Sequence, residues 1–247
     1  MNNTTIETLQ NHRSIRKFKK KQLSNNQIEE IIRSAQQAST SSYVMAYSII
    51  GITKPKIKEE LSLVSGQSYV KENGHFLVFC ADLHRVYSQA SIQDQEKMIA
   101  SLESTEQFIV ATVDASLAAQ NAVIAAESMG LGACYIGSLR NNINKVNDLL
   151  ELPDYVIPLF GLALGYPDEE PELKPRLPME IIYHENQYNT NQNGKVAEFD
   201  EKLKDYYQSR STNKRYDTWT NQMIRKYSHP VRLDVGPFVK NKNMNRS

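Results

Sequence analysis

The 247-residue sequence predicts an α+β sandwich rather than a doubly wound α/β fold. Four apolar, β-rich runs are typical of buried strands, but helical patterns do not alternate with them strictly, as a parallel sheet would require. After Pro167 the chain turns polar and proline-rich. We therefore expect a core at residues 1–180 and an extension at residues 181–247, within one domain overall.

The first elements follow from local signals. Residues 5–12 predict a short helix. Ser24 and Gln27 form a capping-box pattern before "IEEIIRSAQQAS", which has helical spacing, and the polar run "STSS" ends that helix. The next run, "AYSIIGIT", is rich in β-formers and predicts a strand.

A helix at residues 54–66 ends at Gly66, a residue suited to a helix C-terminus. The run "HFLVFCAD" lacks polar alternation and predicts a strand buried on both faces. Residues 84–104 are polar, and we expect helical or irregular structure there.

Residues 106–129 form the most apolar helical pattern, with almost no polar stripe. A helix of this kind is expected to be buried nearly all round. Close approach by another helix, which could come from a second subunit, would explain the pattern.

The remaining core elements are a strand in "ACYIGSL", a short helix in "NNINKVNDLLELP" and a strand in "YVIPLFGLALGYP". In the extension we predict one helix at about residues 196–208 and a frayed basic tail from about Gly236.

The composition argues against several classes of protein. The net charge is +1, which gives no general field to attract nucleic acid or an acidic membrane. Cys80 and Cys134 lie in apolar runs and are expected to be buried free thiols in a reducing compartment. The N-terminus lacks the apolar core of a signal peptide. The late apolar run "YVIPLFGLALGY" is shorter than a membrane helix needs. We expect a soluble, cytoplasmic protein.

Common catalytic motifs are missing. "GLGACY" lacks the third glycine of a dinucleotide fingerprint and leads from a helix into a strand, the reverse of the required order. No P-loop occurs, and the five histidines show no metal-ligand spacing. The sequence therefore shows no signature of metal or nucleophilic chemistry.

Clustered cations are the remaining signal. "HRSIRKF" places Arg13 and Arg16 around Ser14, and "LKPRLP" holds Lys174 and Arg176 between prolines. Arginine matches a phosphate bidentately, and prolines reduce the entropy lost on binding. Each cluster could equally be a solvated basic surface. "YIGSLRNN" could bring backbone close to a ligand, or could simply end a strand.

Energetics favour several clusters acting together. A micromolar ligand needs about 8 kcal/mol of binding free energy. Charge-assisted hydrogen bonds give roughly 1.5–3 kcal/mol each, so one arginine pair is too little. A phosphorylated aromatic ligand would use several segments, but its identity does not follow from these residues.

The motifs "HRSIRKF", "GLGACYIGSLRNN", "IPLFGLALGYP", "LKPRLP" and "YYQSRSTNKRYDTW" occur in this order. Together they resemble the flavin-dependent nitroreductase superfamily, in its branch of oxygen-insensitive NADPH nitroreductases and NADPH–flavin reductases. The resemblance covers essentially the whole chain. It implies a mixed, mostly antiparallel sheet flanked by helices, and a homodimer with FMN at the subunit interface, in which the helix at 106–129 is the dimer-core helix.

The resemblance also implies site residues. The FMN phosphate and ribityl chain would be held by His12, Arg13, Ser14 and Arg16, with Lys174 and Arg176 closing on the phosphate. Gln67 would contact the polar edge of the flavin, and Thr40 would come from the partner subunit. The backbone of Ile136, Gly137 and Ser138 would pack against the ring. Arg210 and Arg215 would bind the NADPH 2′-phosphate, which favours NADPH over NADH.

The implied activity is ping-pong hydride transfer from NADPH through FMN to nitroaromatics, quinones or free flavin. Two departures affect cofactor choice and substrate range: Ser138 stands where many members have glycine, and His229–Pro230 stands where some have Arg–Pro. Three alternatives stay open, namely a reductase that supplies free reduced flavin, a non-catalytic flavin-binding module, and a structural dimer with a vestigial site.

Overall fold

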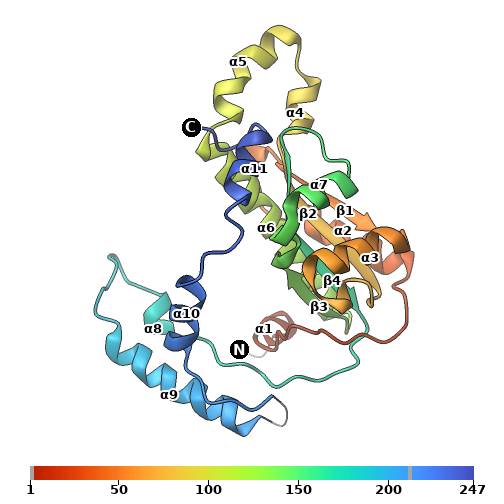
Figure 1. The fold of residues 1–247 in the computed structure, drawn as a ribbon. Coiled ribbons are helices and arrows are strands. Elements are labelled where there is room, and N and C mark those ends of the chain that lie inside the picture. The colour runs from red at the N-terminus through yellow and green to blue at the C-terminus, as the bar shows by residue number, and fades with distance from the viewer. Residues whose placement is uncertain (1–2, 211–212) are drawn as a thin grey trace. The chain divides into compact units, whose positions relative to one another are not determined.

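A computed structural model describes residues 3–210 and 213–247 and divides the chain into two compact units (Figure 1). The core unit comprises the residues up to Pro171 together with Arg232–Ser247, and the arm unit is Glu172–Val231. The sequence placed a single boundary at residue 180. In the structure the chain leaves the core unit earlier and returns to it at the end.

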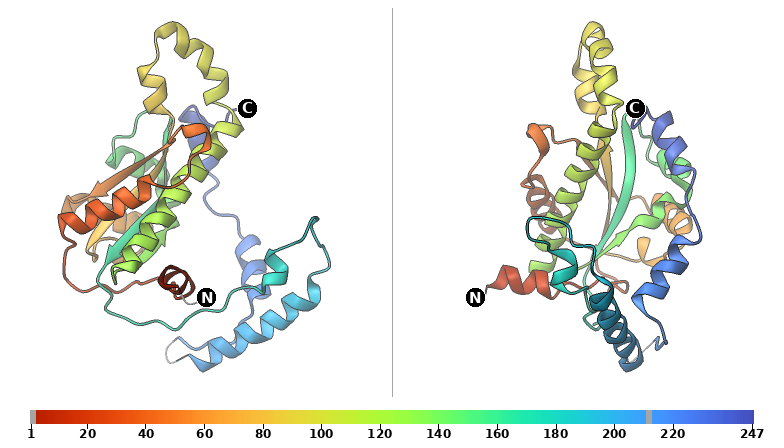
Figure 2. Two further views of the ribbon diagram at one scale, coloured as in Figure 1. Left: turned by 180° about the vertical axis from the view of Figure 1, so that it is seen from behind. Right: turned by 90° about the vertical axis from the view of Figure 1, so that its left-hand side faces the viewer.

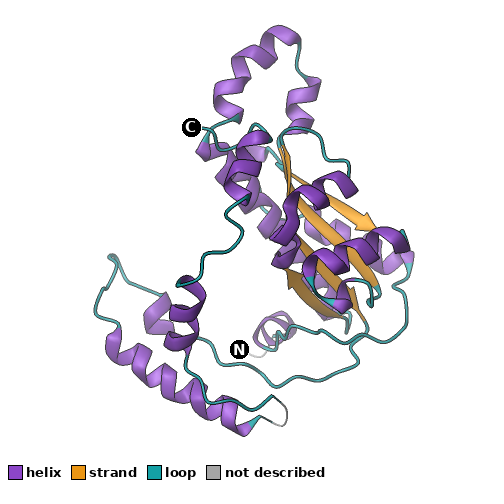
Figure 3. Cartoon of the chain, in the orientation of Figure 1, coloured by secondary structure: helices purple, strands orange, loops and turns teal. Residues whose placement is uncertain are grey.

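The core unit is built on one four-stranded sheet (Figure 3). Its strands are β1 (Tyr47–Ile52), β2 (His75–Asp82), β3 (Gly132–Ile136) and β4 (Val156–Gly165). The order is β1-β2-β4-β3, and all neighbours are antiparallel. Within the described residues, one isolated parallel bridge, Ser14 to Ala133, accompanies the sheet. The predicted α+β class is confirmed.

Helices cover both faces of this sheet (Figure 2). The α-helices of the core unit are α1 (Thr4–Gln10), α2 (Asn25–Gln36), α3 (Pro55–Ser65), α4 (His84–Gln89), α5 (Ile92–Leu102), α6 (Thr105–Ser128), α7 (Ile143–Leu149) and α11 (Val235–Asn241). Short 3-10 helices are η1 (Ser41–Tyr43), η2 (Ser68–Val70) and η3 (Gly137–Asn142). The predicted capping box opens α2, and Gly66 follows α3 with a φ of 67°.

Strand β2 supplies the centre of the core, because every one of its residues is buried. Successive side chains of a strand point to opposite faces. Leu77 and Phe79 pack on the face covered by α2 and α6, whereas Phe76 and Val78 pack with α3 and α7 on the other face. This double burial explains why the sequence of β2 shows no polar alternation.

Helix α6 is long and apolar enough to cross a membrane by length and composition alone. It packs along α2 and the sheet through small residues such as Ala118 and Ala122. The sequence predicted burial nearly all round, but one face of α6 is exposed on this subunit. Ile109, Val113 and Leu117 are 51%, 47% and 42% exposed and form a stripe at intervals of four residues. We call these three residues the α6 stripe.

The arm unit contains three helices in its described residues, namely α8 (Met179–Ile182), α9 (Asn193–Ser209) and α10 (Trp219–Tyr227). Its small core is formed by Phe199, Leu203 and Tyr207 of α9, with Trp219 packed against them. The helix predicted at 196–208 is confirmed as α9, whereas α8 and α10 were not predicted.

Two predictions, one for the C-terminal tail and one for the end of strand β3, are wrong. The tail from Gly236 is not frayed, because α11 forms there and buries Phe238 and Val239, and Met244 beyond it is fully buried. The strand predicted in "ACYIGSL" ends at Ile136, and the chain then turns into η3.

His75, at the start of β2, predicts a pH dependence of stability. Burial lowers the pKa of His75, and the charge of Lys58 adds to this shift. Between its depressed native pKa and the unfolded value of about 6.5, the unfolded chain binds more protons than the native chain, so stability falls as the pH falls. In urea unfolding at pH 7.5 and 5.5, wild-type protein should lose more stability than His75→Gln. The exposed His229→Gln serves as control, and an equal loss in wild type and His75→Gln would contradict the assignment.

Candidate functional site

The segment that carries Arg13, Ser14 and Arg16 lies beside strand β3. The amide of Ile15 donates to the carbonyl of Ala133 at 3.0 Å, next to the Ser14–Ala133 bridge. Gly132 permits this approach, since a Cβ there would lie 2.6 Å from Cγ1 of Ile15. Two of the segments predicted from the sequence are therefore neighbours in the structure.

Arg16 lies where three segments predicted to contact the ligand meet: its own segment, the one around Gln67, and the one that contains Cys134. Arg16 is exposed, and its guanidinium lies close enough to the Tyr69 hydroxyl, as does the thiol of Cys134, to influence the pKa of Tyr69. Burial and the neighbouring thiol raise the pKa of Tyr69, while Arg16 opposes this shift. In the described part of the chain Arg16 has no carboxylate in an ion pair. An exposed guanidinium beside a hydroxyl, with no counter-ion, suits a phosphate.

Tyr69 was missed by the sequence analysis. It lies two residues after Gln67, and a hydroxyl so close to a predicted flavin contact was the available signal. Gln67 itself has a fixed backbone, because its amide donates to Ser62 O at 3.3 Å and its carbonyl accepts from Ser62 Oγ at 2.9 Å. Within the described residues its side-chain amide forms no hydrogen bond, so it is available to a ligand.

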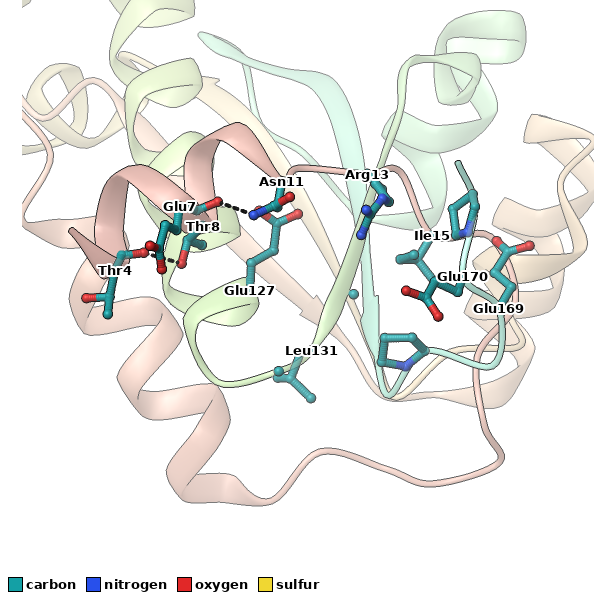
Figure 4. A pocket seen from close by; sticks show the side chains of 14 residues that line it. Thr4, Glu7, Thr8, Asn11, Arg13, Ile15, Glu127, Leu131, Glu169 and Glu170 are labelled. Carbon is teal, nitrogen blue, oxygen red and sulfur yellow. Dashed lines mark hydrogen bonds between the residues drawn. The ribbon is translucent and has the colours of Figure 1, made fainter. Parts of the chain in front are cut away.

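His12 and Arg13 have different surroundings from Arg16. His12 Nδ1 lies 2.7 Å from Glu127 Oε1. Arg13 lines a cavity of about 640 Å³, and its Nε is buried without a hydrogen-bond partner (Figure 4). The same cavity is lined by four carboxylates, those of Glu7, Glu127, Glu169 and Glu170. Glu169 also accepts from the backbone amides of Arg16 and Lys17, at 2.5 and 3.0 Å. Arg16 does not line this cavity, so the four carboxylates disfavour a phosphate at Arg13 more than at Arg16.

Residues 136–138 follow β3 directly. Ile136 is buried, and Gly137 leaves room for the guanidinium of Arg140, whose Nη2 would lie 3.3 Å from a Cβ at this position. Arg140 donates to the carbonyl of Leu159 and so ties η3 to β4. Ser138 does not lie in the left-handed region, so the backbone tolerates its side chain without strain.

Thr40 lies just before η1. Its hydroxyl donates to the buried carboxylate of Asp114 at 2.5 Å. The same oxygen accepts from the amide of Met45 at 2.8 Å. The hydroxyl proton of Thr40 is therefore committed inside the subunit.

The other four predicted cations belong to the arm unit. Lys174 and Arg176 are exposed, and Arg176 Nη1 donates to the carbonyl of Lys174 at 2.8 Å. Arg210 lies 5.8 Å from the ring centre of Tyr206, and Arg215 lies 4.0 Å from that of Tyr207. Arg210 Nε also lies 3.8 Å from Glu172 Oε2, and Arg215 Nε lies 3.9 Å from Asp217 Oδ2, so an anion at either arginine would compete with a carboxylate.

Tyr207 connects the two cation pairs of the arm unit. Burial alone raises the pKa of Tyr207, but hydrogen bonds and charges from Lys174 and Arg215 outweigh it, so this pKa lies below the ordinary value. Gln222 Oε1 accepts from Tyr207 Oη at 3.2 Å and from Arg215 Nη2 at 2.8 Å. Lys174 and Arg215, far apart in sequence, are thus held around one buried ring. A cavity of about 400 Å³ is lined by Lys174, Arg176, Gln222 and mostly apolar side chains of the arm unit.

His229 is exposed, and its Nδ1 lies 3.0 Å from the carbonyl of Arg225. The motif that carries Arg210 and Arg215 includes residues 211 and 212, which lie outside the described residues.

Family models match most of the chain. A model described as "Nitroreductase family" matches residues 9–166, and one described as "Nitroreductase family, C-terminal domain" matches residues 174–247. An "FMN reductase (NADPH)" from Bacillus subtilis strain 168 is 49% identical over 99% of this chain and 100% of its own length.

Solved structures are similar over the whole chain. NfrA1 from B. megaterium is 50% identical with a TM-score of 0.95, covering 99% of this chain and 100% of that chain. The NADPH:FMN oxidoreductase from Vibrio harveyi, solved with NAD⁺, is 36% identical with a TM-score of 0.90 and the same coverage.

Proposed function

The chain belongs to the nitroreductase family, and we propose that it is an FMN-dependent oxidoreductase that passes hydride from NADPH to a small-molecule acceptor. The observation that carries the proposal is Arg16, an exposed cation beside Tyr69 whose guanidinium forms no ion pair with any carboxylate of residues 3–210 and 213–247. FMN, when bound, supplies the hydride chemistry, and the protein supplies binding and orientation.

The described residues fit such a group. Arg16 and Tyr69 present donors to a phosphate. Gln67 is two residues before Tyr69 in the sequence, and we propose that its side-chain amide bonds to the polar edge of the flavin ring. Lys174 and Arg176 add two exposed cations from the arm unit. His12, Arg13, Ser14, Thr40 and residues 136–138 are proposed as further flavin contacts. No side chain is assigned as a catalytic acid or base.

Arg210 and Arg215 are proposed to bind the 2′-phosphate of NADPH. Both stack on tyrosines, and Gln222 fixes Arg215, so their donors are pre-organised and lose little entropy on binding. NADH lacks this phosphate and is expected to react more weakly.

The protein is proposed to act as a cytoplasmic homodimer. The α6 stripe, Ile109, Val113 and Leu117, leaves a row of large apolar side chains exposed on one subunit. Such a row is typical of a surface covered by a second helix. Buried free thiols at Cys80 and Cys134 suit a reducing compartment.

A second candidate is a reductase whose acceptor is free FMN, as the names of the B. subtilis and V. harveyi relatives indicate for those proteins. Competition between FMN and a quinone for the NADPH-reduced enzyme separates the two. An enzyme that strongly prefers free FMN supports the second candidate.

The test of the proposed function is an absorbance spectrum of the purified protein, followed by anaerobic addition of NADPH or NADH. We expect flavin bands that NADPH bleaches faster than NADH. Arg215→Ala should weaken NADPH binding about 10-fold or more, the effect of one lost charge-assisted hydrogen bond, and leave NADH unaffected. Lys202→Ala, an exposed lysine of α9, is the control. A colourless protein that does not take up added FMN would overturn the proposal.

A further inference from the structure

The loop from Thr40 to Ala46 has an unusual backbone. Ser42, Tyr43 and Met45 have φ values of 47°, 60° and 50°, although none is glycine. L-residues adopt this region at a cost in free energy, and several such residues persist together only where the surroundings hold them. This loop therefore needs an anchor.

Asp114 of α6 is that anchor. Its side chain is buried, with 1% exposure, and accepts three hydrogen bonds from the loop. Oδ2 accepts from Thr40 Oγ1 at 2.5 Å and from the amide of Ala46 at 3.0 Å, while Oδ1 accepts from the amide of Ser41 at 3.1 Å. One carboxylate thus fixes both ends of the loop. Carboxylates are suited to this because all their hydrogen-bonding positions are acceptors.

The anchored loop lies next to the proposed subunit interface. Asp114 follows Val113 of the α6 stripe, and the loop itself exposes Tyr43, Val44 and Met45 by 80%, 39% and 39%. In the proposed dimer Thr40 reaches the flavin of the partner subunit. Because its hydroxyl proton is already donated to Asp114, Thr40 can contribute only through its backbone or an oxygen lone pair, and both depend on where Asp114 holds it.

We propose that Asp114 is a positioning residue for the flavin site of the partner subunit, acting through Thr40 and the 40–46 loop. This inference rests on the proposed FMN-binding dimer. A residue needed only for folding would affect its own subunit. The proposal instead predicts that a change at Asp114 weakens FMN binding at the site of the other subunit.

Asp114→Asn is the first variant, since it keeps the size of the side chain but replaces one acceptor oxygen with an NH₂ group. At least one of the three loop donors then faces another donor, which weakens the hold of residue 114 on the loop, while Arg85 still donates to the carbonyl of Met45. We expect FMN to bind at least 10-fold more weakly, with the circular dichroism spectrum and dimer mass unchanged. Thr40→Val should reproduce the loss, and Thr40→Ser, which keeps the hydroxyl, should largely restore FMN binding.

A mixed dimer tests action across the interface. One subunit carries Arg16→Ala, the other carries Asp114→Asn, and different affinity tags isolate the hybrid. If Asp114 acts on the partner's site, one site combines an intact Arg16 with an intact loop, and the other contains both changes. The hybrid should then bind one FMN per dimer with wild-type affinity, although both parent homodimers bind FMN poorly.

The outcomes separate the two proposals. A hybrid with no high-affinity site would mean that Asp114 acts within its own subunit or on folding, and would overturn the inference while the yellow wild-type protein still supports the proposed function. Wild-type FMN affinity in the Asp114→Asn homodimer would also overturn it. A wild-type protein that binds no FMN would overturn both. If Asp114→Asn does not fold, Thr40→Val takes its place in the hybrid.

Discussion

Replacing Arg16 with alanine should leave the protein folded and largely free of FMN. Among the predicted phosphate contacts of the core unit, Arg16 is exposed, lies beside Tyr69, and has a guanidinium that forms no ion pair within the described residues. Loss of two charge-assisted hydrogen bonds, at roughly 1.5–3 kcal/mol each, weakens binding by about 100-fold or more. Fluorescence titration of the apoprotein with FMN measures this loss.

The design of the Arg16 experiment separates binding from chemistry. Arg33→Ala is the matched control, because Arg33 is an exposed arginine whose only described partner is Glu29 in the same helix. Arg13→Ala should weaken FMN binding less than Arg16→Ala, since carboxylates surround Arg13. With saturating FMN, Arg16→Ala should regain most of its NADPH turnover. A variant that keeps stoichiometric FMN but loses turnover would show that the assignment of Arg16 is wrong.

Most of the core could be predicted because its signals are local. Strand β2 is a continuous apolar run, and the start of α2 depends on a capping box that spans four residues. Helix α11 could not be predicted this way, since its formation depends on Phe238 and Val239 packing into a core formed by distant residues such as Leu83 and Leu102. A short helix gains most of its stability from such packing.

The same limit applies to the site. The cations were visible in the sequence because Arg13, Arg16, Lys174 and Arg176 occur in short motifs. Tyr69 and Asp114 were not, because each matters only through a partner that folding brings near: Arg16 for Tyr69, and Thr40, 74 positions away, for Asp114. Asp114 instead looked like one polar residue in an apolar helix.

Val113→Asp should convert the proposed dimer into monomers and remove FMN with it. Val113 is the central residue of the α6 stripe, so a carboxylate there would be buried without a partner when two subunits associate. An uncompensated buried charge costs about 3–5 kcal/mol, equal to a 100-fold or greater weakening of association. Light scattering after gel filtration measures the mass, and absorbance measures the bound flavin.

Leu63→Asp is the control for this change, because Leu63 is an equally apolar residue, 65% exposed, on α3 at the opposite face of the sheet. It should stay dimeric and yellow. If Val113→Asp stays a dimer, the α6 stripe is not the interface. If it becomes a monomer yet binds FMN with wild-type affinity, each subunit holds a complete flavin site, and the argument that Thr40 and Asp114 serve the partner fails. If Val113→Asp loses both the dimer and the bound flavin, the flavin site must contain residues of both subunits.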